Sequence, residues 1–195
     1  MDEPRLILAS VSARRQQLLS QLGYAYRIDV SHREEPFIGG LSPEDNTRLL
    51  ATGKAEEVER RNPRAVVLGA DTIVALDNAP LGKPADESEA IHMLTQLSGR
   101  THDVYTSVFI TNGINIRTCT EKSTVHFHAL EKECIQAYVE TGEPMDKAGA
   151  YGIQGKGALF VETITGDYYN IVGLPVFKVT QMLAYFHIYP QWVKK

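Results

Sequence analysis

Cysteine, long apolar runs and excess positive charge are all scarce in this sequence. The chain has two cysteines, Cys119 and Cys134, too few for a disulfide framework and wrongly spaced for a zinc or redox motif. No stretch approaches the roughly 20 apolar residues that span a bilayer. The apolar run at residues 6–9 is too short for a secretory signal, and two arginines follow it. We therefore expect a cytoplasmic chain without a membrane partner.

The charge balance gives no support for a nucleic-acid partner. Basic residues number 20 and acidic residues 24, a net charge of −4, whereas a duplex DNA binder usually carries a basic excess on its binding face. The hydrophobic share of 43% is ordinary for a globular chain. The length suits one core, and no linker divides it. We predict a single domain over residues 1–195 that does not bind nucleic acid.

Apolar and β-branched runs predict the strands of a sheet. They cover residues 5–9, 24–30, 65–76, 101–111, 114–128, 158–164 and 168–172. Asn112-Gly113 lies between two of these runs and is a strong hairpin signal, and Gly166 marks a turn between the last two.

Capping residues and apolar periodicity predict the helices. These should run from Ser12 to Gly23, from Ser42 to about Arg61, from Asp86 to near Gly99, and over 131–140 and 174–186. Buried strands that alternate with helices, together with an antiparallel hairpin, predict an α/β fold with a mixed sheet and flanking helices.

The first candidate for a functional site is the turn from the first strand into the first helix. Ser10, Ser12, Arg14 and Arg15 gather there, and hydroxyl, guanidinium and helix-start N–H groups all suit phosphate oxygens. Each arginine in a first helical turn opposes the helix dipole by roughly 0.3–1 kcal/mol at exposed sites. A bound anion would remove that penalty. The residues alone leave open a phosphate site or a pair of solvated arginines.

The second candidate is Asp71, which interrupts the apolar run 66–74. A carboxylate among such neighbours must find a cation, a metal or a proton, because desolvation costs several kcal/mol. Asp71 is therefore a candidate metal ligand or general base, with a buried salt bridge to Lys54 or Lys83 as the structural alternative. Gly69, two residues before it, predicts room for a ligand beside the backbone.

Two weaker candidates also carry charge. Lys83 follows the turn after the strand that contains Asp71, and Glu34-Glu35 places adjacent carboxylates in a loop. Divalent ions such as Mg²⁺ take oxygen ligands and share them with substrate phosphates. Each of these residues, taken alone, is more typical of a solvated surface.

The third candidate is the run 146–157, which has glycines at 149, 152, 155 and 157. Glycines allow a backbone to approach a ligand closely, and they also form plain hairpin turns. The run is not a P-loop, because Ala150 stands where the motif needs its first glycine. Gln154 offers a donor and an acceptor, which match the imide edge of uracil or thymine.

In this order and spacing, the candidate stretches resemble the Maf family of nucleoside triphosphate pyrophosphatases. The matching stretches span nearly the whole chain: Leu8-Ala9-Ser10-x-Ser12-x-Arg14-Arg15, Lys54-Ala55, Gly69-Ala70-Asp71-Thr72, Gly82-Lys83-Pro84, Leu97-Ser98-Gly99, the run 146–155, and Val172-Gly173-Leu174-Pro175.

The resemblance implies an inosine triphosphate pyrophosphatase-like fold, with two lobes around a cleft. It implies hydrolysis of a nucleoside triphosphate to the monophosphate and pyrophosphate with a divalent cation, Mg²⁺, Mn²⁺ or similar, and it is compatible with a homodimer. Asp71 would be the catalytic proton acceptor and, with Glu34, a metal ligand. The positions that handle phosphate would be Ser10, Arg14, Arg15, Lys54 and Lys83.

The resemblance also bears on the base. Members that cleave dTTP and UTP are similar to this chain at Gly-Ala-Asp-Thr and Ala-Tyr-Gly-Ile-Gln-Gly, whereas members that cleave 7-methyl-GTP carry Ser-Asp-Gln at the first stretch. Arg14, Thr72 and Gln154 would set specificity for a pyrimidine. The alternatives are a 7-methyl-GTP pyrophosphatase and a nucleotide-binding regulator of cell division that needs no catalysis.

Two departures from the family pattern affect helices. Ala13 replaces the usual proline, and as a good helix former it should preserve the turn. Gly53 replaces a usual Glu or Gln beside Lys54, where glycine costs roughly 1 kcal/mol relative to alanine. We expect it to loosen the helix there.

Overall fold

A computed structural model describes residues 5–32 and 37–194. Within them, a seven-stranded mixed sheet has the order β2-β1-β3-β5-β6-β7, with β4 paired to β3. The strands are β1 (Leu6–Leu8), β2 (Tyr26–Ile28), β3 (Val66–Leu76), β4 (Ala79–Leu81), β5 (Thr101–Thr111), β6 (Ile116–Phe127) and β7 (Val161–Thr165). The predicted α/β fold with a mixed sheet is confirmed.

The helices lie largely where their capping residues predict them. They are α1 (Ala13–Gln21), α2 (Pro43–Arg61), α3 (Glu87–Leu97), α4 (Lys132–Val139), α5 (Tyr168–Val172) and α6 (Val176–Tyr185), with short 3₁₀ turns η1 (Glu143–Asp146), η2 (Ala148–Ala150) and η3 (Lys156–Phe160). Ala13 begins α1 as expected, and α2 continues through Gly53 without a break.

The chain folds as two compact units that interleave along the sequence. One comprises Met1–Asp71, Thr106–Glu121 and Gly173–Lys195, and the other comprises Thr72–Tyr105 and Lys122–Val172. Strands β3, β5 and β6 each supply residues to both. The two units agree with the predicted two lobes, while the predicted cleft stays a prediction.

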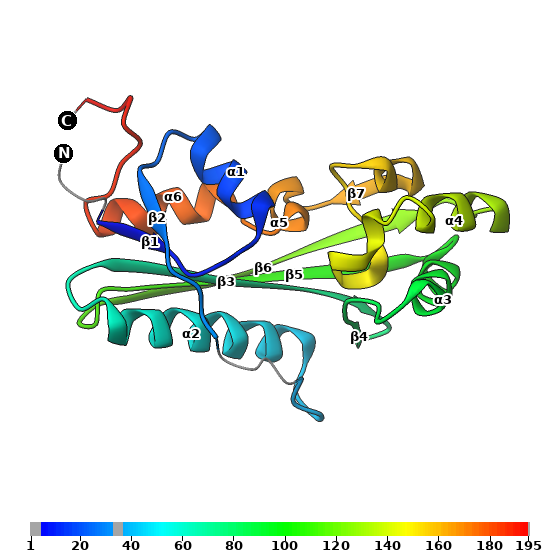
Figure 1. Cartoon of the computed structure of the whole chain (residues 1–195), viewed down its shortest axis with the longest axis horizontal. Coiled ribbons are helices and arrows are strands. Elements are labelled where there is room, and N and C mark those ends of the chain that lie inside the picture. Colours follow the sequence, from blue (N-terminus) through cyan, green and yellow to red (C-terminus); the bar gives the residue numbers. More distant parts are fainter. Residues whose placement is uncertain (1–4, 33–36, 195) are drawn as a thin grey trace. The chain divides into compact units, whose positions relative to one another are not determined.

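The first unit has a sheet whose two faces are both covered by helices. Strand β1 pairs in parallel with β2 and β3, so that Leu8 lies beside Leu68. Helix α2 runs along one face, and α1 and α6 lie on the other (Figure 1). Coverage of both faces explains why β1 and β3 are apolar without alternation.

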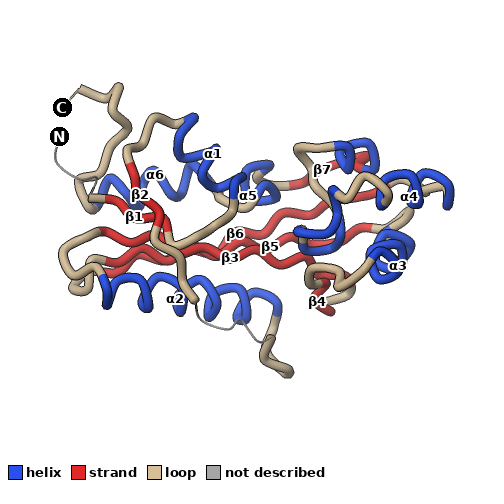
Figure 2. Tube along the Cα trace, in the orientation of Figure 1, coloured by secondary structure: helices blue, strands red, loops and turns tan. Residues whose placement is uncertain are grey.

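The second unit has its own core, in which α3 packs against α4 (Figure 2). Leu94 and Leu97 of α3 meet aromatic side chains from three other segments there, Phe127, Tyr138 and Phe160. The edge-to-face contact of Tyr138 with Phe160, with centroids 4.8 Å apart, holds α4 to η3.

Of two strands predicted near the end of the second unit, one is wrong and the other begins later than predicted. Residues 168–172 form helix α5 rather than a strand, because Asp167 accepts from the Tyr169 N–H at 2.8 Å and starts a helical turn. That turn directs Asn170 inward, where its side-chain amide donates to the Val104 carbonyl at 3.0 Å. The predicted strand over 158–164 begins only at Val161, after η3.

After β3 the chain makes a tight turn and returns as a short strand. Asp77 and Asn78 take left-handed φ values of 51° and 62°, which suits a tight hairpin. Strand β4 then pairs antiparallel with the end of β3, with Pro80 beside Ala75. Pro80 fits because a proline is tolerated on a short edge strand.

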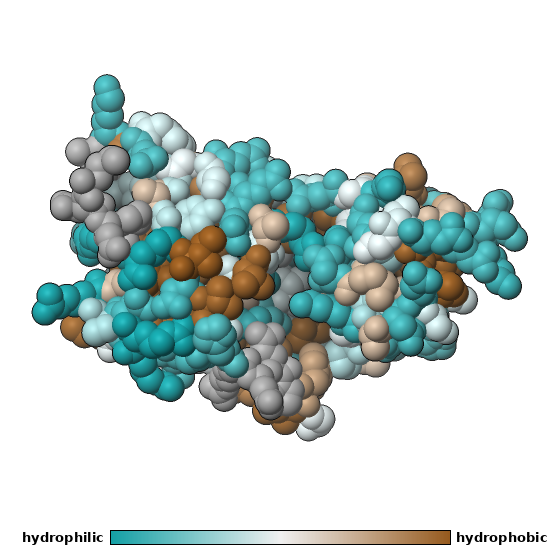
Figure 3. Space-filling model, in the orientation of Figure 1, coloured by the Kyte–Doolittle hydropathy of each residue, from teal (hydrophilic) through white to brown (hydrophobic). Residues whose placement is uncertain are grey.

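Among the described residues, no helix is both long enough and apolar enough to cross a membrane. Figure 3 shows a largely hydrophilic face on which the apolar side chains form small patches.

Candidate functional site

The start of α1 is an assembled donor site at the carboxyl end of β1. Ser12 caps the helix, and its side chain accepts from the Arg15 N–H at 3.5 Å. The Ser10 hydroxyl accepts from the Ser12 N–H at 3.2 Å, which fixes the chain between strand and helix. Helix-start N–H groups therefore gather beside two hydroxyls, as the sequence predicts.

Arg15 is buried, and its contacts are internal. Its Nε donates to the Gly173 carbonyl at 2.8 Å and its Nη1 donates to Ser10 Oγ at 3.2 Å. The guanidinium thus ties α1 to the segment before α6 and holds the Ser10 hydroxyl in place. Of the two alternatives that the sequence left open, a phosphate site or solvated arginines, the second does not hold for Arg15, because its side chain is buried. Its predicted phosphate contact stays a prediction, as does that of Arg14, which is half-buried.

Replacing Arg15 with methionine is expected to lower the free energy of unfolding by about 2 kcal/mol, because the Gly173 carbonyl loses a charged donor. Chemical denaturation measures the change. A Gln17→Met variant on the exposed side of the same helix should shift stability by less than about 0.5 kcal/mol. Equal effects of the two changes would show that the Arg15 tie contributes nothing.

Asp71 lies on the face of β3 that α2 covers. Alternation along the strand places Val67, Gly69 and Asp71 on one side. Val67 packs with Ala51 and Ala55 of α2 in one core cluster. The small residues allow the helix to approach closely, since a Cβ on Gly69 would lie 2.4 Å from the Ala51 carbonyl oxygen. Gly69 therefore serves helix packing, and its predicted role as room for a ligand is wrong.

This close approach brings Lys54 to Asp71. Lys54 Nζ donates to Asp71 Oδ1 at 2.6 Å, and each side chain is 12% exposed. The Asp71 carboxylate is therefore paired with a cation, as its apolar neighbours require. Of the two lysines that the sequence offers as partners, the structure pairs it with Lys54. This salt bridge fits a purely structural acid. It fits a catalytic acid equally well, because a general base must also be held in a fixed orientation. The pair remains partly open to solvent.

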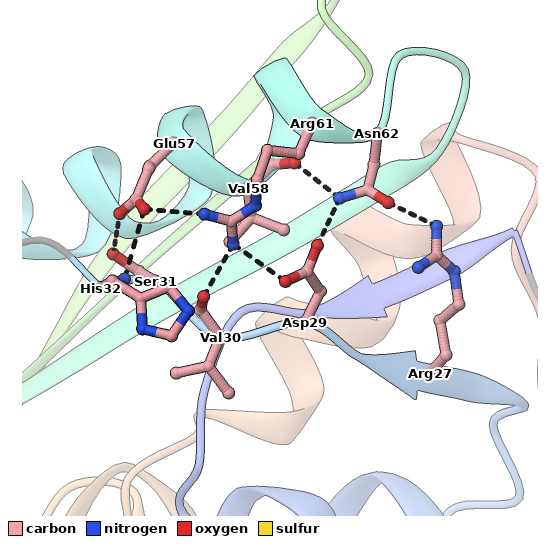
Figure 4. A network of polar contacts seen from close by, with 9 residues as sticks. All are labelled: Arg27, Asp29, Val30, Ser31, His32, Glu57, Val58, Arg61 and Asn62. Atoms are coloured by element: carbon pink, nitrogen blue, oxygen red, sulfur yellow. Dashed lines mark hydrogen bonds and ion pairs between the residues drawn. The ribbon is translucent and has the colours of Figure 1, made fainter.

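A polar network fixes the chain between β2 and α2 (Figure 4). Asp29 accepts from Arg61 at 2.8 Å and from Asn62 at 2.6 Å. Glu57 accepts from Arg61 at 2.8 Å and from the His32 N–H at 3.2 Å. Burial tends to raise the pKa of Asp29, but the donors Asn62 and Arg61 hold it below its ordinary value. The loop is thereby anchored on α2 as far as His32.

Glu34, the predicted second metal ligand, lies outside the described residues. In the part of the chain that the structure does describe, no three His, Cys, Asp or Glu side chains are grouped to hold a metal ion. Asp71 fits a divalent cation only as a shared ligand, since Mg²⁺ is commonly held by one or two carboxylates plus substrate phosphates. Lys54 would compete with the cation for the same carboxylate.

The second unit contains the remaining predicted residues. Thr72 follows Asp71 along β3 and is half-buried, while Lys83 and Gln154 are exposed. The Gly82 carbonyl, next to Lys83, accepts from the Gly149 N–H at 3.0 Å. The structure thus joins the Gly82-Lys83-Pro84 stretch to the Gly-rich run, two segments far apart in the sequence.

The glycines of the run 146–157 contact the protein's own side chains. A Cβ on Gly152 would lie 2.6 Å from Lys147 Cε, and one on Gly155 would lie 2.3 Å from Glu143 Oε1. The prediction that these two glycines leave space for a ligand is wrong, and the run is a series of 3₁₀ turns rather than a hairpin. Sequence reasoning missed Glu143. Its only signal is a carboxylate just before a Gly-rich stretch.

Tyr151 anchors the middle of the run in the core. Its hydroxyl is 2.9 Å from His102 Nε2, and its ring makes an edge-to-face contact with Phe127. Burial lowers the pKa of His102 to about 4 and raises the pKa of Tyr151. Both side chains are therefore neutral near neutral pH, which suits their apolar surroundings.

The fold and these clusters define an α/β protein with a donor-rich helix start and a carboxylate–ammonium pair between strand β3 and helix α2. A model of Maf-like proteins matches residues 5–186. The chain belongs to the Maf-like protein family.

Curated relatives cover most of the chain. A protein of Bacillus velezensis is 53% identical over 94% of this chain and 97% of its own length. One from Bacillus pumilus is 51% identical over 95% and 98%, and one from Symbiobacterium thermophilum is 51% identical over 93% and 94%. Each is named a dTTP/UTP pyrophosphatase. A solved structure, the Ham1 protein of Staphylococcus aureus, covers 63% of this chain and 71% of its own at 13% identity and a TM-score of 0.45.

Proposed function

We propose that this chain is a nucleoside triphosphate pyrophosphatase that cleaves dTTP, UTP and related pyrimidine triphosphates to the monophosphate and pyrophosphate. The observation that carries the proposal is the Lys54–Asp71 pair, 2.6 Å apart, in the same unit as the donor-rich start of α1. Relatives about as long as this chain and about half identical to it are named dTTP/UTP pyrophosphatases, which supports the same assignment.

In the proposed reaction, Asp71 accepts the proton of the water that attacks the α-phosphorus. Lys54 orients the carboxylate for this step. Ser10, Arg14 and the start of α1 bind phosphate oxygens, and Lys83 is a further candidate for this role. A divalent cation shared between Asp71 and the substrate would neutralise charge on the departing pyrophosphate.

The deciding experiment incubates the purified protein with a panel of nucleoside triphosphates, with Mg²⁺ or Mn²⁺ or with a chelator. Pyrophosphate rather than orthophosphate should appear with UTP and dTTP, and the chelator should abolish it. Release of pyrophosphate mainly from 7-methyl-GTP would favour the other branch of the family. Tight binding of nucleotide without any pyrophosphate would favour a regulator.

The proposal includes a cytoplasmic location and a small-molecule nucleotide as partner. The homodimer and the lack of nucleic-acid binding stay predictions.

Gln154 is the proposed reader of the base. Its exposed amide can donate to a uracil carbonyl and accept from the uracil N3–H. Replacing Gln154 with leucine removes both hydrogen bonds and should lower kcat/KM for UTP at least about tenfold. The value of kcat/KM for CTP should stay that of the wild type. Steady-state kinetics on the two substrates test this, and an unchanged UTP/CTP ratio would remove Gln154 from base selection.

A further inference from the structure

The turn that displays Gln154 is held by a carboxylate. Glu143 Oε2 accepts from the Lys156 N–H at 3.0 Å, and its Oε1 accepts from the Gly157 N–H at 3.2 Å. The Tyr138 hydroxyl donates to the same Oε1 at 3.0 Å. One side chain thus organises two successive backbone amides just beyond Gln154, as a bound anion would in a backbone nest.

The near side of the turn is held by the same pair. The Tyr138 hydroxyl accepts from the Gly152 N–H at 3.1 Å, and the Gly155 N–H donates to the Gly152 carbonyl at 3.2 Å, which closes the turn. Gln154 lies within this turn. Both of its ends are therefore fixed through the Tyr138–Glu143 pair.

The packing around Glu143 and the charge of its carboxylate both indicate that this side chain is needed to hold the turn. Gly155 leaves no room for a side chain, because a Cβ there would lie 2.5 Å from the Glu143 carboxyl carbon. Burial acts to raise the pKa of Glu143. The Lys156 and Gly157 amides, Tyr138 and the charge of Lys147 outweigh it and hold that pKa below the ordinary value. These donors therefore stabilise the ionised form of the Glu143 carboxylate.

We propose that Glu143 is a positioning residue for substrate selection, because its carboxylate sets the turn through which Gln154 meets the base. This inference rests on the proposed function for the identity of the ligand, a pyrimidine nucleotide. Glu143 itself need not touch the substrate. Its loss should weaken recognition of the base without changing the residues proposed to bind phosphate.

The test measures binding, so that it does not depend on turnover. Affinities for the α,β-imido analogues of UTP and CTP are determined by calorimetry in the presence of Mg²⁺ for four proteins: wild type, Glu143→Gln, Tyr138→Phe and Glu162→Gln. In Glu143→Gln the amide group turns a donor toward the backbone donors of the loop. Tyr138→Phe keeps the ring against Phe160 and removes only the hydroxyl. Glu162, on β7 with a side chain that is 57% exposed, is the matched control for a Glu→Gln change.

Wild type and Glu162→Gln should prefer the UTP analogue. Glu143→Gln and Tyr138→Phe should lose about tenfold of that preference, with affinity for the CTP analogue nearly unchanged. Amide hydrogen exchange at residues 152–157 should accelerate in the same two variants. If Glu143→Gln does not fold, Tyr138→Phe alone decides the matter.

The inference would be overturned by a wild type with no preference between the analogues, or by a preference that survives in the variants of the Tyr138–Glu143 pair. A wild type that prefers the UTP analogue but releases no pyrophosphate would defeat the proposed function and leave this inference standing. A merely structural role would weaken both analogues equally, and that outcome also counts against it.

Discussion

Replacing Asp71 with asparagine is expected to leave a folded protein whose kcat for UTP is about 10³-fold lower, the typical contribution of a general base. Asparagine has the same shape, and its Oδ1 can still accept from Lys54, so α2 should stay in place on β3. It cannot accept a proton at neutral pH. Release of pyrophosphate measures the rate, and circular dichroism during heating checks the fold.

Two further variants separate catalysis from stability. Asp77→Asn, at an exposed partner of Arg100, should keep both the rate and the melting temperature. Lys54→Met leaves the Asp71 carboxylate without its cation and should cost about 3 kcal/mol of unfolding free energy. Near-normal turnover in Asp71→Asn would show that the pair is structural, and the proposed function would lose its base.

The Lys54–Asp71 pair shows how far the sequence leads. The apolar run around Asp71 requires a partner for the carboxylate, and that follows from desolvation alone. Two lysines could supply it, and the choice depends on which helix lies over which face of the sheet. Gly69, Ala51 and Ala55 determine this, but their small size becomes informative only once α2 is known to cross β3 at that point.

The Gly-rich run shows the opposite case. The residues that support a ligand site and those that support a self-packed turn are the same glycines. Glu143 and Tyr138 lie outside the turn in the sequence and give no periodic signal of their contact with it. The wrongly predicted strand over 168–172 has a similar cause, since Asn170 is directed inward by its tertiary hydrogen bonds against local β propensity.

Introducing alanine at Gly69 is expected to destabilise the protein by about 3 kcal/mol, at the upper end for overpacking of a core. The new Cβ would lie 2.4 Å from the Ala51 carbonyl oxygen and 2.8 Å from the Ala55 nitrogen. Both are backbone atoms of α2, so no side chain can rotate away and the helix itself must shift. The melting temperature should fall by roughly 10 °C.

The same shift of α2 should also displace Lys54 from Asp71, because Lys54 lies on α2 immediately before Ala55. At a temperature where the Gly69→Ala protein remains folded, its kcat should fall although no proposed catalytic residue has changed. Gly39→Ala, where a Cβ would meet nothing within 4 Å, is the control and should alter neither property. Calorimetry and pyrophosphate release test the two effects separately. If Gly69→Ala lost stability but kept full kcat, the distance from Lys54 to Asp71 would not limit catalysis, and orientation of the carboxylate by Lys54 would have to be abandoned as part of the mechanism.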